Sequence, residues 1–242
     1  MESRGTGVHS GRRRAGIVGA LVVAVVVGAL GLAAPASAQR PADRLAGRAS
    51  DHSWLIEGAR WDACRPITYA VNTRHLRADA AGKRAYVAEV RWAVRQIRLA
   101  SGLQLRYRGT TTAVPQRGVA NPAGVDVLIA WARPGRDSSW LTERRYLGYG
   151  GAEAVGHRLR NGFVVMNADV AHRYPSRRYR GDRRAWNRRI TTLHELSHAI
   201  GAGHAHGRSQ VMYPTLAGQA YRFGAGDATI MRTLGADRSA CS

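Results

Sequence analysis

The stretch HELSHAIGAGH at residues 194–204 determines how the rest of this sequence is interpreted. It fits the pattern H-E-x-x-H-x-x-G-x-x-H at every fixed position. On a helix, His194 and His198 lie one turn apart and point to the same side, so both imidazoles can reach one metal ion. Gly201 can leave the helix through a left-handed conformation, and the turn then brings His204 back as a third ligand. Three protein ligands and an open fourth position are typical of a catalytic zinc site.

Glu195 completes this candidate site, because its carboxylate flanks the helical histidines and can reach a water on the metal without binding the metal. A polar helix face with solvated histidines is the plain alternative, but the number of fixed positions makes an accidental match rare. His206 is an alternative third ligand, which the spacing disfavours relative to His204. The remaining histidines of the mature chain lack paired spacing and are interpreted as isolated side chains: His52, His75, His157 and His172.

A methionine follows the histidine run, within the segment QVMYP at residues 210–214. Taken alone, Met212 is best explained as core packing. Taken together with the histidine run, it resembles the Met turn of the metzincin zinc peptidases, and Val-Met-Tyr-Pro resembles the matrixin version of that turn. The resemblance implies that Met212 shapes the floor beneath the metal. It also implies that Tyr213 and Pro214 form part of the wall of the pocket for the side chain after the cut.

The resemblance extends over residues 61–242 and implies a fold of the α+β class. A metzincin, zincin-like catalytic domain has a mixed twisted sheet, an active-site helix and a C-terminal helix. Residues 150–154 and 164–169 fall where matrixins place their edge strand and the strand after it, and residues 223–227 fall where their last helix begins. The glycine-rich calcium loops of animal matrixins are not recognisable, so Ca²⁺ has no site that the sequence supports.

Residue patterns predict the elements independently of this resemblance. Residues 67–72 are rich in β-branched and aromatic residues and predict the first strand. Residues 81–100 have apolar side chains at helical spacing, and Gly102 predicts the end of that helix. The other predicted elements are strands at 103–108, 125–131, 151–156 and 162–168, a zinc helix at 184–200 with Asp182 as N-cap, and a last helix at 226–234.

Residues 1–38 predict a secretory signal peptide. Arginines 12–14 form a basic start, residues 15–34 are apolar, and Ala36-Ser37-Ala38 is a small-residue cleavage site. The apolar stretch is long enough to span a bilayer, so an uncleaved N-terminal membrane anchor is the alternative. Residues 39–60 are polar and predict a linker or short pro-segment. We therefore expect a secreted, extracellular protein.

Two cysteines, Cys64 and Cys241, lie near the ends of the expected domain. In an oxidising compartment they are expected to form one disulfide that ties these ends together. Some matrixins instead block the zinc with a cysteine of the pro-segment. Cys64 lies in the segment ACRP, which lacks the rest of that switch motif, so the disulfide is the favoured interpretation.

The chain is strongly basic, with a formal net charge of +21 over 242 residues. Removal of the leader, which carries four Arg and one Glu, leaves +18. The arginines are scattered, most densely over residues 173–189, and no nucleic-acid-binding motif accompanies them. We expect nonspecific association with polyanions or cell-wall polymers, no specific nucleic acid, and a monomer.

The reaction that the resemblance implies, and that these residues are suited to perform, is hydrolysis of a peptide bond in a protein or peptide substrate. Zn²⁺ held by the three histidines lowers the pKa of its bound water toward ~7, and Glu195 accepts the water proton as general base. A catalytically silent, basic cell-surface or polyanion-binding protein on a metzincin scaffold is the main alternative. It is disfavoured because such a scaffold has no chemical need for Glu195. A zinc hydrolase acting on a non-peptide bond is a third hypothesis.

Overall fold

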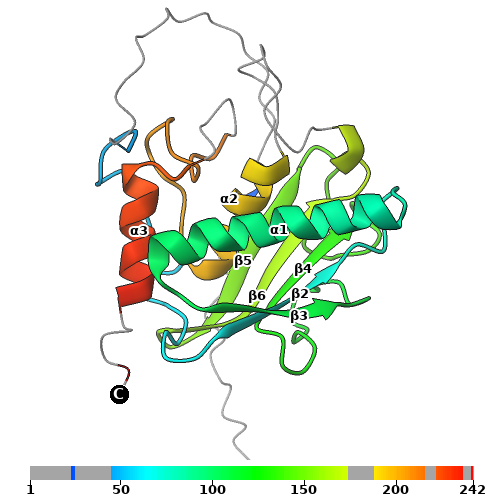
Figure 1. Ribbon diagram of the computed structural model, residues 1–242, viewed down its shortest axis with the longest axis horizontal. Helices are drawn as coiled ribbons and strands as arrows, with labels where there is room; N and C mark the ends of the chain where they lie inside the picture. Colours follow the sequence, from blue (N-terminus) through cyan, green and yellow to red (C-terminus); the bar gives the residue numbers. More distant parts are fainter. Residues whose placement is uncertain (1–22, 25–44, 174–187, 216–221, 237–240, 242) are drawn as a thin grey trace, which may run out of the picture.

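Strand β4 (Val127–Ala132) lies in the interior of the sheet, and all of its residues are buried. The computed structural model describes residues 23–24, 45–173, 188–215, 222–236 and 241 (Figure 1). Within them the fold is α+β, as predicted, with one mixed sheet and helices packed on it. The other strands are β1 (Val23–Ala24), β2 (Ile67–Asn72), β3 (Leu105–Thr110), β5 (Gly148–Val155) and β6 (Arg158–Asn167).

The strands follow the order β1-β5-β6-β4-β2-β3 across the sheet. Strands β3, β2, β4 and β6 run parallel, whereas β5 is antiparallel to β6 and β1 is antiparallel to β5. The carboxyl ends of the parallel strands therefore share one end of the sheet, and β5 begins at that same end. The predicted strands are confirmed, with boundaries that shift by a few residues.

Helix α1 (Ala80–Ser101) crosses in front of the sheet (Figure 1). The side chain of Asp79 accepts a hydrogen bond from the backbone N–H of Gly82 at 2.7 Å, so it caps the first turn. Gly102 ends the helix in a left-handed conformation at φ +74°. The helix and its predicted stop at Gly102 are confirmed.

Helix α2 (Arg188–Ile200) packs between α1 and the strands β5 and β6. Its residues from Ile190 onward are all buried. The indole N–H of buried Trp61 donates to the carbonyl oxygen of Ala199 at 3.0 Å, which fixes the start of the expected domain against this helix. Helix α3 (Ala225–Gly235) packs against α1, as the pattern at 226–234 predicts. Asp182, predicted as the N-cap of the zinc helix, lies outside the described residues.

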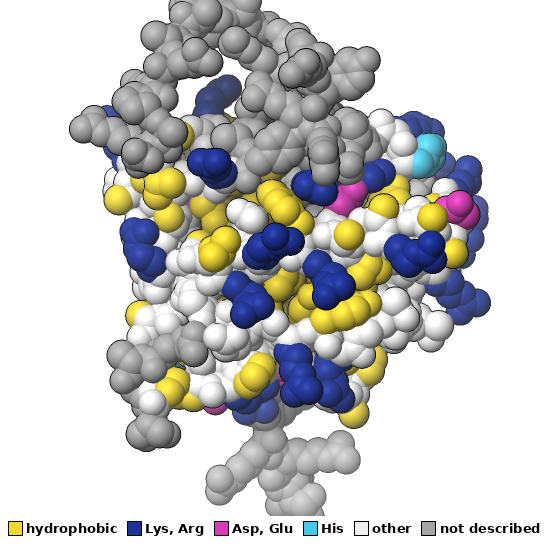
Figure 2. Space-filling view, viewed as in Figure 1, with side chains coloured by type: hydrophobic (Ala, Val, Ile, Leu, Met, Phe, Trp, Pro, Cys, Tyr) yellow, Lys and Arg dark blue, Asp and Glu magenta, His cyan; other side chains and the backbone are white. Residues whose placement is uncertain are grey.

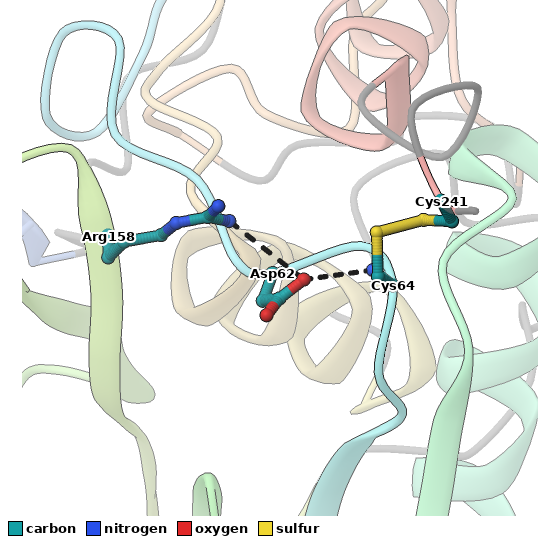
Figure 3. Close-up of a disulfide and its surroundings, with 4 residues drawn as sticks. All are labelled: Asp62, Cys64, Arg158 and Cys241. Atoms are coloured by element: carbon teal, nitrogen blue, oxygen red, sulfur yellow. Dashed lines mark hydrogen bonds and ion pairs between the residues drawn. A yellow bond between two sulfur atoms is a disulfide. The ribbon is translucent and has the colours of Figure 1, made fainter.

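The two cysteines form the predicted disulfide (Figure 3). The Cα atoms of Cys64 and Cys241 are 5.3 Å apart, and 177 positions separate them in the sequence. The carboxylate of Asp62 accepts a hydrogen bond from the backbone N–H of Cys64 at 3.0 Å and lies 4.0 Å from Arg158 of β6. Because Cys64 is bonded to Cys241, its thiol is not available to block a metal. The bond is consistent with an extracellular protein.

No helix in the described ranges is long and apolar enough to cross a membrane. Of the predicted signal segment, residues 1–38, only β1 is described, and there the chain pairs with β5. The signal peptide and its cleavage stay predictions.

Replacing Cys64 and Cys241 together by serine is expected to lower the free energy of unfolding by up to about 5 kcal/mol. The reason is that the bond closes a long loop and restricts the unfolded chain. Urea denaturation of the two proteins measures the difference. Reduction of the wild-type protein is the control and should reproduce the loss, whereas an unchanged midpoint would show that the bond adds no stability.

Candidate metal centre

The end of α2 brings the third histidine back toward the first two. Gly201 has a φ of +118°, a conformation that side chains rarely adopt, as the sequence predicts for this position. The backbone N–H groups of Gly201 and Ala202 both donate to the carbonyl oxygen of Ser197, at 3.1 and 3.0 Å. A Cβ at Gly201 would also lie 2.9 Å from Leu159 and Leu234. Glycine is therefore required here by both conformation and space.

Three imidazoles meet at this point. One nitrogen from each of His194, His198 and His204 lies within 4.8 Å of the others, and the Nε2 atoms of His194 and His198 are 3.1 Å apart. Nδ1 of His194 donates to the carbonyl oxygen of Val211, and Nδ1 of His198 to that of Ala202, both at 2.7 Å. These bonds place the proton of each ring on Nδ1 and leave a lone pair on each Nε2. Two lone pairs that face each other at this distance are what a shared metal ion requires.

The surroundings of the cluster keep the rings neutral. His194 and His198 are fully buried. Burial, together with the smaller effect of the neighbouring His204, lowers the pKa of His194 to about 3. Burial also lowers the pKa of His198 well below its usual value and that of His204 to about 4. Neutral imidazole is the form that binds a metal. Nε2 of His204 is buried and has no hydrogen-bond partner within the described residues.

Glu195 is fully buried beside the cluster. Burial raises the pKa of its carboxyl group well above the usual value, and the backbone N–H of Gly150 opposes this shift. Neither carboxyl oxygen reaches hydrogen-bonding geometry with any described residue. Leaving a buried carboxyl without a partner costs stability, and such groups concentrate at functional sites.

Glycines in β5 allow the strand to lie against Glu195. A Cβ at Gly150 would overlap the carbonyl oxygen of Glu195, and a Cβ at Gly148 would lie 3.1 Å from its Cγ. Any larger residue at Gly150 would force β5 and α2 apart. The predicted edge strand is therefore in direct backbone contact with the helix that carries the candidate base.

The turn that contains Met212 is held by a buried carboxylate. Asp227 of α3 accepts hydrogen bonds from the backbone N–H groups of Val211 at 2.6 Å, Met212 at 3.1 Å and Gly224 at 2.9 Å. Burial raises the pKa of Asp227 to about 6, with these three donors opposing the shift, so the group is ionised at neutral pH. Since the carbonyl of Val211 orients His194, Asp227 positions a candidate ligand through one peptide unit.

The predicted linker or pro-segment also contacts this loop. Residues 45–60 are described, and within them Ser53 donates from its hydroxyl to the carbonyl oxygen of His204 at 2.7 Å. The carbonyl oxygen of Ser53 accepts from the backbone N–H of Gly203, and the N–H of Leu55 donates to Gly201, both at 2.8 Å. These bonds make residues 53–55 part of the frame that holds His204. A pro-segment role for residues 39–60 stays a prediction.

The other residues predicted for the site also lie in the described part of the chain. Met212 is buried in the turn that Asp227 holds, and its place beneath the metal stays a prediction. Tyr213 and Pro214 are half-buried directly after it, and their role in a substrate pocket stays a prediction. His206 is exposed and lies outside the cluster that contains His204. Three supporting residues were not predicted from the sequence: Ser53, Gly150 and Asp227. A glycine-rich start of β5 and an acid early in the last helix were the only signals available.

No known family model matches the chain, and no curated protein is significantly similar to it in sequence. The chemistry of the histidine cluster and of Glu195 therefore carries the functional argument.

Replacing Asp227 by asparagine is expected to lower the free energy of unfolding by about 2–4 kcal/mol, because one amide oxygen cannot serve three buried N–H donors. Loss of the support for His194 should also weaken metal binding by about 10–100-fold. Chelator competition with Zn²⁺ and urea denaturation measure the two effects. Asp169→Asn, which removes a carboxylate with no side-chain hydrogen bond in the described part of the chain, is the control. Unchanged metal affinity in Asp227→Asn would contradict the positioning role.

Proposed function

We propose that the chain is a secreted, zinc-dependent endopeptidase of the metzincin type, similar to the matrixins. The observation that carries this proposal is the pair of Nε2 atoms of His194 and His198, which face each other at 3.1 Å with both Nδ1 atoms already hydrogen-bonded. The buried, unpartnered nitrogen of His204 supplies a third ligand of the same kind. Three neutral imidazoles form a ligand set that suits zinc.

Glu195 is the proposed general base. A bound zinc ion supplies Lewis-acid polarisation of the scissile carbonyl and makes water more acidic. The carboxylate of Glu195 accepts the proton of the attacking water and then delivers it to the leaving nitrogen as the peptide bond breaks. Its burial, which excludes bulk water and leaves its oxygens unpaired, suits a group that must exchange protons with a substrate.

The edge of β5 is the proposed site for the extended substrate backbone. Residues Val23 and Ala24 pair with Gly150 and Tyr149 of this strand in antiparallel register, so its edge accepts an extended segment. Cleavage after Ala38, as the sequence predicts, would remove these residues and open the edge. A substrate strand bound in the same way would lie beside Glu195, because Gly150 contacts the backbone of that residue.

The main alternative is a silent scaffold that binds polyanions. It explains the net charge of the chain. It gives no reason for a buried carboxyl group that has no hydrogen-bond partner among the described residues and lies beside three clustered imidazoles. A zinc hydrolase of a non-peptide bond would share the same cluster. The strand-pairing edge of β5 favours a peptide substrate over such a compound.

Glu195→Gln is expected to bind one zinc ion per chain and to lose at least about 100-fold in turnover of an unstructured protein, since it removes the general base. Its free energy of unfolding should not fall, because the wild-type carboxyl is buried without a partner. Zinc analysis, cleavage assays and urea denaturation measure these quantities, with zinc-chelated wild-type protein as the inactive control. Near-normal turnover in this variant would refute the role of Glu195.

His204→Ala is expected to weaken zinc binding by more than about 100-fold, beyond the 10–100-fold that follows loss of a residue supporting a ligand. His206→Ala is the matched control, because this exposed neighbour lies outside the cluster. Chelator competition measures both affinities. The reverse ranking of the two variants would assign the third ligand to His206.

A further inference from the structure

Several arginines converge at the end of the sheet where the parallel strands finish. Strands β2, β4 and β6 end at Asn72, Ala132 and Asn167, and the segments beyond them surround a cavity of about 590 Å³. Ligands of open sheets with parallel strands bind at this end, where the connecting segments separate. Figure 2 shows basic side chains along the face that α1 crosses, with several at the end where α1 begins. The arginines that line the cavity are Arg77, Arg133, Arg136, Arg144 and Arg173.

Most of the positive charge in this cavity has no partner in the described part of the chain. Arg133 is paired with Asp137, with contacts of 2.8 and 2.9 Å. The other four guanidinium groups make no ion pair or side-chain hydrogen bond with any described residue, and Asp169 is the one acid in the lining. Like charges around one hollow repel, so an anion bound there would relieve repulsion as well as form its own ion pairs.

The walls of this cavity are held in place before any ligand binds. Asn167 is buried, and its amide nitrogen donates to the carbonyl oxygens of Arg144 at 3.1 Å and Tyr146 at 2.8 Å. Its amide oxygen accepts from the backbone N–H of Asp169 at 3.0 Å. One buried side chain thus fixes both the segment before β5 and the turn after β6. A preorganised site loses less entropy when it binds a ligand.

Residues of this cavity also line a hollow that borders helix α2 and strand β6. This second, narrow and mainly apolar hollow shares Asn167 and Val170 with the cavity and is lined further by Met166 and Thr191. Thr191 precedes Glu195 by one turn of α2, and Met166 pairs with Gly148 at the start of β5. A strand antiparallel to β5, as β1 is, runs with its carboxyl end toward Gly148 and hence toward this end of the sheet. The part of a substrate that follows the cut therefore points toward the arginines.

We propose that the arginine cavity binds acidic side chains of the substrate on the carboxyl side of the cleaved bond. The inference rests on the proposed function and deepens it, because it assigns a substrate class: proteins with an acidic segment downstream of the cut. Arg136 and Arg144 are the specificity-determining residues to test, since both are exposed and lie in the segments that follow β4 and precede β5.

The test uses zinc-loaded mature protein and three peptides that share one cleavable core. One peptide carries three glutamates after the core, one carries them before it, and one carries glutamines. We expect kcat/KM for the downstream-acid peptide to be about tenfold higher than for the other two, and this advantage to decline as NaCl is raised. The double variant Arg136→Gln with Arg144→Gln should lose the advantage. Arg95→Gln with Arg106→Gln, which removes the same charge from exposed positions on α1 and β3, should keep it.

Equal cleavage of the three peptides, or equal losses in both double variants, would overturn the inference while leaving the proposed peptidase intact. If no peptide is cleaved, the proposed function fails. Binding of the same peptides to Glu195→Gln, measured by fluorescence anisotropy, then tests separately whether the arginine cavity binds acidic peptides. The site would be supported if the downstream-acid peptide binds more tightly than the other two, and if the Arg136 and Arg144 double variant loses this preference while the Arg95 and Arg106 double variant keeps it. Binding of inorganic tripolyphosphate without any such peptide preference would identify a small-anion site and overturn the assignment to substrate.

Discussion

The hydrogen bond from Nδ1 of His194 to the carbonyl oxygen of Val211 connects the parts of the molecule on which the candidate site depends. It fixes the tautomer of the ring, so Nε2 carries the lone pair that a metal needs. It also joins α2 to the turn that contains Met212, and this turn is bonded in its own right to Asp227 of α3. Loss of any of these links would leave the imidazole of His194 without a defined orientation.

The loop that carries His204 is tied to the same frame from two sides. The backbone N–H of Ala205 donates to the carbonyl oxygen of Met212 at 2.8 Å, which joins this loop to the methionine turn. Ser53 holds the carbonyl group of His204 from the other side. The position of His204 therefore depends on segments far apart in the sequence. The disulfide of Cys64 and Cys241 separately joins the start of the domain to the segment after α3. A site built on such cross-links is rigid, as a three-ligand metal centre requires.

The sequence predicted the cluster of His194, His198 and His204 well because its geometry is local. Helical periodicity relates His194 to His198, and the glycine at position 201 indicates the end of the helix and the turn toward His204. Neither inference needed knowledge of distant segments. The predicted helices and strands were confirmed for the same reason, since each depends on its own apolar pattern. Asp227 and Ser53 could not be found in this way. Their roles come from contacts across 15 to 151 positions, and an isolated acid or serine has no distinguishing pattern.

The glycines of β5 show a second limit of such prediction. The predicted strand began at residue 151, whereas β5 begins at Gly148, and its glycines admit α2 to within contact of the strand backbone. This close approach has a consequence for the proposed chemistry. The general base must lie next to a substrate that pairs with β5, so the separation of helix and strand sets the separation of base and scissile bond. A strand with larger side chains would form the same sheet, but it would hold the substrate too far from Glu195 for proton transfer. Under the proposed function, the glycines at these positions therefore serve catalysis as well as the packing of α2 on β5.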